Sequence, residues 1–242
     1  MERGLTLLVA ALVAHLSFSN AQVEITRSAC GVTKLCVETP DDCAPDGTDN
    51  CLFTSVVAAA PVAPNGAMLS IELRGDSSGY IAVGLTVDAT VGTTMLFICA
   101  QNSATKAFVF RTMTMNNIGG VLTANSEPVS AVNGMVTGDV IKCEFNITSV
   151  NATRSRGRSS QATTFSILLG TGTTNGDNVG PFNLVLNSGP LDLANPASNV
   201  VNATAAAPPT MPNSGGAVQP HAVLLLLSVL SLAVMLRGGS CG

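Results

Sequence analysis

The sequence is poor in residues on which many catalytic and nucleic-acid-binding proteins depend. It has no tryptophan, one tyrosine and two histidines, and only 11% of its 242 residues are charged. The two histidines are His15 and His221, so the long middle of the chain offers no imidazole for a hydrolase triad or a zinc shell. Eleven Lys and Arg stand against fifteen Asp and Glu, and this acidic balance argues against nucleic acid as a partner.

The sequence also lacks an uninterrupted apolar run of the roughly 20 residues that span a bilayer. The run from Leu5 to Leu16 is shorter; Arg3 precedes it and Ser19-Asn20-Ala21 follows it. This is the pattern of a cleaved secretory signal peptide. We therefore expect residues 1–21 to be removed and the mature chain to begin at Gln22.

A second short apolar run, from Ala222 to Leu236, carries no charge. Small residues precede it, as in chains that receive a glycolipid anchor, and we take residues 222–242 as the anchor signal. A short single membrane span is the alternative. The expected location is the outer face of the plasma membrane. The candidate attachment residues are Asn213, Ser214 and Gly215.

Cysteine usage agrees with a secreted chain. There are seven cysteines, and Cys241 lies in the expected anchor signal. In an oxidising compartment the others predict three disulfides, because the sequence has neither a Cys-x-x-Cys pair nor a nearby histidine for zinc. We expect two of the bridges to form within a cysteine-rich lead-in, residues 22–51. The predicted disulfide cysteines are Cys30, Cys36, Cys43, Cys51, Cys99 and Cys143.

Acidic residues also gather in the lead-in, at Asp41, Asp42, Asp46 and Asp49. They lack the alternating spacing and the closing Glu of a calcium loop. The pattern predicts solvated turn residues and no metal site.

From residue 52 the pattern is that of β-strands. Leu69, Ile71 and Leu73 alternate with polar residues, which predicts a strand with one wet face. The runs 79–85 and 95–99 are apolar on both faces and predict central strands. With weaker candidates near Val56 and Val121, about seven strands are expected, typical of an all-β antiparallel β-sandwich over residues 52–193.

The clearest alternation places Ile141, Cys143, Phe145 and Ile147 on one face of a strand. Cys143 therefore points inward, and its default partner across the core is Cys99, since an unpaired thiol would be unusual in this compartment. The opposite face carries Lys142, Glu144 and Asn146. Glu72 and Glu144 could pair for sugar cleavage, but their spacing gives no reason to expect them within catalytic reach.

Three Asn-x-Ser/Thr sequons predict N-glycosylation at Asn146, Asn151 and Asn202. Asn146 falls on the polar strand face, where a glycan is compatible with packing. The basic run from Arg154 to Arg158 predicts a solvated loop, with contact to an anionic polysaccharide or partner as the alternative. Residues 194–221 are rich in Pro, Ala and Thr and predict a semi-extended stalk.

Several segments together resemble a known family. They are Gly79-Tyr80-Ile81-Ala82-Val83-Gly84-Leu85, Phe97-Ile98-Cys99, Ile141-Lys142-Cys143-Glu144-Phe145 and Ile167-Leu168-Leu169-Gly170-Thr171-Gly172. With the cysteine-rich opening, this series is similar to the DOMON domain of the ferric-chelate reductase (stromal cell-derived receptor) family. The resemblance covers roughly Cys30 to Leu193 and implies a DOMON-like β-sandwich that either holds haem b for electron transfer or serves as an interaction module.

The haem-binding form of this domain uses an axial methionine and an axial histidine, and here the sequence departs from it. Val91 stands where a methionine commonly precedes the glycine, and both histidines lie in the segments expected to be removed. Thioether alone is a weak ligand, so haem is disfavoured. The remaining methionines, read as core packing, are Met95, Met113, Met115 and Met135.

The reductases of the family also carry a multi-helix cytochrome region, and no segment of this sequence could form one. The sequence therefore predicts a non-enzymatic, membrane-tethered binding module whose partner is an extracellular protein or a small apolar ligand. Relatives with only this domain and a hydrophobic tail include a synaptic glutamate-receptor-associated protein, which suggests receptor association. Haem-based electron transfer is the alternative function, and sugar binding is a third.

Overall fold

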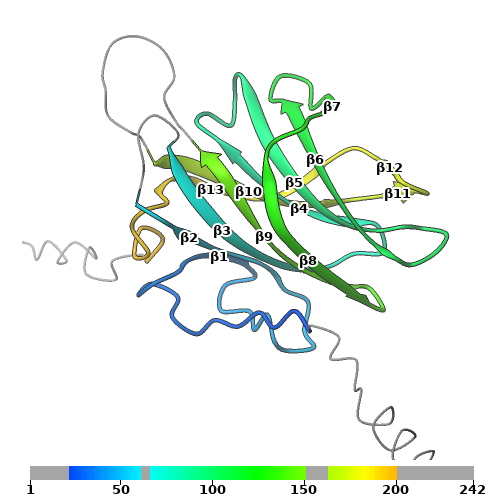
Figure 1. Cartoon of the computed structure of the whole chain (residues 1–242), viewed down its shortest axis with the longest axis horizontal. Coiled ribbons are helices and arrows are strands. Elements are labelled where there is room, and N and C mark those ends of the chain that lie inside the picture. The colour runs from blue at the N-terminus through cyan, green and yellow to red at the C-terminus, as the bar shows by residue number, and fades with distance from the viewer. Residues whose placement is uncertain (1–21, 61–65, 151–162, 201–242) are drawn as a thin grey trace, which may run out of the picture. The chain divides into compact units, whose positions relative to one another are not determined.

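The computed structural model describes residues 22–60, 66–150 and 163–200. They form two antiparallel β-sheets stacked as a sandwich, which confirms the all-β prediction (Figure 1). The first sheet has five strands in the order β1-β2-β3-β9-β8. Their bounds are β1 Leu35–Thr39, β2 Leu52–Ala58, β3 Ala67–Asp76, β8 Val129–Thr137 and β9 Val140–Val150.

The second sheet has six strands in the order β13-β10-β4-β5-β6-β7. A two-stranded hairpin, β11-β12, follows β10 along the chain. None of the described residues forms a helix long and apolar enough to cross a membrane. The bounds are β4 Tyr80–Thr86, β5 Thr93–Gln101, β6 Phe108–Asn116, β7 Leu122–Ala124, β10 Thr164–Gly172, β11 Thr174–Asn175, β12 Asn178–Val179 and β13 Asn183–Asp192.

The main core lies between the two sheets, where β4 packs on β3 and β5 packs on β9. Alternation along each strand sends every second side chain into this layer. Phe97 and Phe145 meet there with ring centroids 5.4 Å apart. A disulfide between Cys99 of β5 and Cys143 of β9 crosses the same layer, with both cysteines fully buried.

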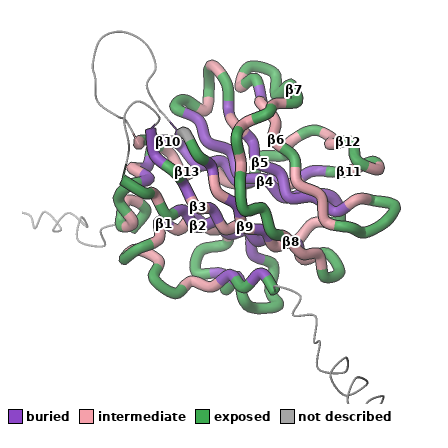
Figure 2. The backbone as a smooth tube through the Cα atoms, in the orientation of Figure 1, coloured by how far each residue is buried: buried purple, intermediate pink, exposed green. Residues whose placement is uncertain are grey.

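A second apolar layer covers the outer face of the six-stranded sheet. Tyr80, Leu96, Ile98 and Leu168 are buried there, and Phe182 is among the partly buried residues packed against them. This layer explains why β4 and β5 are apolar on both faces, and their interior positions in the sheet agree with the prediction of central strands. Figure 2 shows the burial along these strands and the exposure of β8.

The strand inventory is larger than the roughly seven expected. The candidates near Val56 and Val121 correspond to β2 and β7, whereas β8 and β13 were not anticipated. Most residues of β8 are at least partly exposed, and β13 is an edge strand with two exposed apolar residues, so neither shows the expected alternation. In addition, β1 lies inside the lead-in, which therefore contributes an edge strand to the five-stranded sheet.

Candidate functional site

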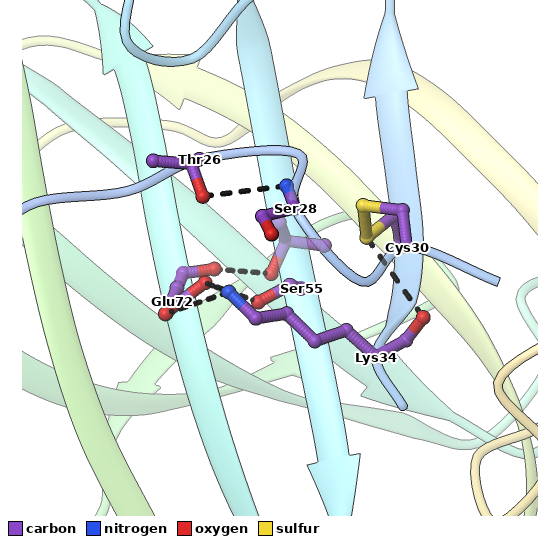
Figure 3. Close-up of polar contacts among 8 residues, drawn as sticks. Thr26, Ser28, Cys30, Lys34, Ser55 and Glu72 are labelled. Carbon is purple, nitrogen blue, oxygen red and sulfur yellow. Dashed lines mark hydrogen bonds and ion pairs between the residues drawn. A yellow bond between two sulfur atoms is a disulfide. The ribbon is translucent and has the colours of Figure 1, made fainter. Parts of the chain in front are cut away.

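The lead-in packs against the outer face of the five-stranded sheet. Val23 and Ile25 are buried with Phe53 of β2 and with the disulfide between Cys43 and Cys51. Figure 3 shows the segment around Thr26 and Ser28 passing across the strands that carry Ser55 and Glu72. The lead-in is thus a cross-linked cover, and it seals a face that strand alternation alone predicts to be wet.

Polar contacts fasten this cover at Lys34 (Figure 3). The Lys34 Nζ donates to both carboxylate oxygens of Glu72, at 3.1 and 2.8 Å. The Ser55 hydroxyl donates to Glu72 Oε2 at 2.6 Å. The Lys34 and Glu72 side chains are only 20% and 24% exposed, so this ion pair is shielded more than a surface pair. Both carboxylate oxygens are committed to holding the lead-in on the sheet.

Sequence spacing gives no reason to expect Glu72 and Glu144 close together, but strand pairing brings their backbones side by side. The two residues are direct partners in the register of β3 and β9, which places their Cβ atoms about 5 Å apart. Their carboxylates nevertheless have separate partners, because Glu144 accepts from the Asn133 amide of β8 at 2.9 Å while Glu72 binds Lys34. Each of these carboxylates is tied to its own neighbour rather than left free as an acid or base.

Arg74 also departs from the wet-face prediction, because the lead-in buries it completely. Its guanidinium forms an ion pair with Asp76 and donates to the main-chain carbonyls of Cys51 and Asp49. A charge this deep needs such partners, since desolvation without them is costly. Arg74 thus links the end of the lead-in to β3, a role that strand alternation does not reveal.

A cleft of about 560 Å³ lies between the lead-in and the segment that follows β13. Its lining includes Arg27, Glu38, Asp42, the Cys30–Cys36 disulfide and Asn199. Burial raises the pKa of Glu38 above its usual value. The Arg27 guanidinium, whose Nη2 lies 2.5 Å from Glu38 Oε1, acts in the opposite direction but does not cancel the effect of burial. The lining of the cleft is mixed: charged side chains border it, and the disulfide, Pro196 and Val200 add apolar surface.

The six predicted cysteines form three disulfides: Cys30–Cys36, Cys43–Cys51 and Cys99–Cys143. Two lie inside the lead-in and the third joins the two sheets, the arrangement expected from the sequence. The four lead-in aspartates are exposed, and Asp42 pairs with Arg27 at 3.1 Å. The described part of the chain contains no cluster of three or more His, Cys, Asp or Glu side chains placed to hold a metal ion. The four lead-in aspartates are Asp41, Asp42, Asp46 and Asp49.

The structure describes only one of the predicted glycosylation sites. Asn146 is half-buried on the outer face of β9, where its Oδ1 accepts from the Ser70 hydroxyl at 2.7 Å. Its glycosylation stays a prediction. Several other predicted features lie outside the described residues: the signal peptide, the basic run, most of the stalk, the sequons at Asn151 and Asn202, and the anchor candidates Asn213, Ser214 and Gly215.

The four candidate methionines do not converge on one point. Met113 and Met115 lie in the outer apolar layer, Met95 packs against the core between the sheets, and Met135 packs against the lead-in cluster. Val91 is exposed.

Haem does not fit the described residues. Tyr80, Leu96, Ile98 and Leu168 fill the outer layer that holds Met113 and Met115, and each is at most 1% exposed. No histidine stands among the described residues to complete an axial pair.

Comparison with known proteins gives one similarity of note. The chain is 25% identical over 210 residues to "Putative ferric-chelate reductase 1" of Danio rerio. This similarity supports the family resemblance that the sequence segments indicate. It covers 82% of this chain but 32% of that protein, so the chain spans about a third of the relative's length. No family model matches the chain, and no solved structure matches it.

Proposed function

We propose that the chain is an extracellular binding module related to ferric-chelate reductases, held at the outer face of the plasma membrane by its C-terminal segment. Its partner is an extracellular protein or a small apolar ligand, and the domain does not itself carry electrons. The similarity to the Danio rerio protein supports the family, and the three disulfides support an oxidising compartment.

One observation carries the choice of binding over electron transfer. The outer apolar layer of the six-stranded sheet is filled by the protein's own side chains, among them the fully buried Tyr80. The Tyr80 ring lies against Gly172, where an added Cβ would come within 2.2 Å of it, and its hydroxyl donates to the Gly180 carbonyl at 3.1 Å. A cofactor could enter this layer only by displacing these contacts.

A visible spectrum tests this choice directly. The full chain, purified from membranes of expressing cells supplied with a haem precursor, is expected to show no haem absorption band. A strong band that shifts on reduction would establish the alternative, a haem-binding electron-transfer domain. A known b-type haem protein expressed in the same cells serves as the control for haem supply.

The tether needs a separate experiment. Intact expressing cells treated with a phosphatidylinositol-specific phospholipase are expected to release the domain into the medium. Retention of the domain, under conditions that release a known glycolipid-anchored protein, would instead indicate a spanning tail. Recovery of the untreated chain in the medium would refute membrane tethering altogether.

A further inference from the structure

Two neighbouring loops present aliphatic side chains to solvent at one end of the six-stranded sheet. Residues 87–92 connect β4 to β5, and residues 117–121 connect β6 to β7 (Figure 1). We call these two segments the aliphatic loop pair. Their four large apolar side chains are Val87, Val91, Ile118 and Val121, which are 45%, 50%, 69% and 63% exposed.

The aliphatic loop pair is held together by Asn117. Its main-chain N–H donates to the Gly92 carbonyl at 3.0 Å, and its side-chain amide donates to the carbonyls of Asp88 and Val91 at 2.6 and 3.1 Å. The Thr94 hydroxyl donates to Asn117 Oδ1 at 2.6 Å. One side chain therefore ties both loops to the start of β5, so the apolar residues are presented on a braced surface.

The aliphatic loop pair carries almost no charge. Asp88 is the one ionisable residue of residues 87–92 and 117–121, and its carboxylate already accepts from the Thr90 hydroxyl and N–H, at 2.7 and 2.8 Å. Gly119 and Gly120 adopt positive φ, and nothing lies within 4 Å of the position where either would carry a side chain. An outward turn with aliphatic tips and no basic residue suits a zwitterionic lipid surface better than an acidic or basic partner.

The last strand of the sandwich, β13, ends at this same end. Thr86, at the end of β4, pairs with Ser166 of β10, and Asp192, at the end of β13, pairs with Thr164 of β10. Leu193 then donates to the Thr163 carbonyl at 3.0 Å. The sequence beyond the last described residue contains the charge-free apolar run 222–236. The aliphatic loop pair and the end of β13 thus lie at one end of the domain, and the described chain continues from β13 to residues 196–200, which lie against the lead-in.

We propose that the aliphatic loop pair inserts its side chains into the outer leaflet of a phosphatidylcholine bilayer to which the tail holds the chain. This inference rests on the tether of the proposed function. It adds a second membrane contact, which orients the sandwich with its loop end toward the lipid.

The absence of tryptophan allows a direct test, because a single introduced tryptophan is the chain's sole indole fluorophore. Ile118→Trp places it in the aliphatic loop pair. Ala104→Trp is the matched control, exposed in the turn from β5 to β6 at the opposite end of the sheet. Each full chain is reconstituted into phosphatidylcholine vesicles with or without brominated acyl chains. We expect brominated lipid to quench Ile118→Trp by about twofold or more at interfacial depth and to leave Ala104→Trp unchanged.

Replacing Val91 and Val121 by serine in the Ile118→Trp chain should reduce the quenching. Equal quenching of the two tryptophan variants would overturn the proposal. A blue shift of Ile118→Trp emission without quenching would also overturn it, because the loops would then contact a second protein molecule. Vesicle flotation distinguishes failure of the loop insertion from failure of the tether. A chain that floats with the vesicles but shows no quenching refutes the loop insertion alone. A chain that does not float refutes both the tether and the insertion that rests on it.

Discussion

Removing the disulfide between the sheets should cost more stability than removing either bridge of the lead-in. The Cys99–Cys143 bridge joins residues 44 positions apart, whereas Cys43–Cys51 joins residues 8 apart. A cross-link lowers the entropy of the unfolded chain by an amount that grows with the logarithm of the number of residues in the loop it closes. The resulting stabilisation is about 4 kcal/mol for the long loop and about 2.5 kcal/mol for the short one. The lost sulfur contacts of the fully buried pair add to the larger value.

The assay is urea unfolding followed by far-ultraviolet circular dichroism on the Cys99→Ala/Cys143→Ala and Cys43→Ala/Cys51→Ala chains. The first variant should also unfold with a steeper dependence on urea, because its unfolded state is freed over a longer segment. A smaller loss of unfolding free energy in the first variant than in the second would refute the reasoning from loop length.

Three further outcomes follow from single side chains. Burial raises the pKa of Tyr80, the one tyrosine of the chain, to about 12. An ultraviolet titration of tyrosinate should therefore have its midpoint near 12 in the folded chain and near 10 in urea. The free energy of unfolding should fall as the pH rises from 10 to 12, because only the unfolded chain ionises in that range. Burial raises the pKa of Glu38 above 4.5, so the folded chain holds the carboxyl proton more tightly than the unfolded chain does. As the pH rises past 4.5, the wild type should therefore lose stability relative to Glu38→Gln, which thermal unfolding at a series of pH values would measure. Gly134→Ala should cost about 1–3 kcal/mol in urea unfolding, since the new Cβ would lie 2.1 Å from the Phe108 ring, and less in a Phe108→Ala background.

The parts of the fold that follow from local alternation could be predicted from the sequence. The alternation along β9 predicts that Cys143 points inward, and an oxidising compartment favours a disulfide there. In the structure its partner is Cys99. Likewise, the two-sided apolar character of β4 and β5 indicates interior strands. These features depend on single segments and on covalent pairing, both of which leave a direct trace in the sequence.

Features that depend on which segments lie together could not be predicted in the same way. Alternation directs Arg74 outward correctly, but it does not show that the lead-in covers that face and buries the guanidinium. The pairing of Glu72 with Glu144 depends on the register of strands distant in sequence. In the sequence Asn117 resembles an ordinary turn residue. Its role in bracing the aliphatic loop pair follows only from the contact between the β4–β5 loop and the β6–β7 loop.

The position of β13 determines how the domain would bear a mechanical load. β13 is an edge strand bonded to β10, and the chain that follows it leads toward the tail. Tension applied from that side would first act on the contact of Asn199 with the Cys36 carbonyl and then on β13, whose pairs with β10 would separate one after another. The residues between Cys99 and Cys143 would not be drawn out while their disulfide is intact, because the tension would pass through the covalent link between β5 and β9.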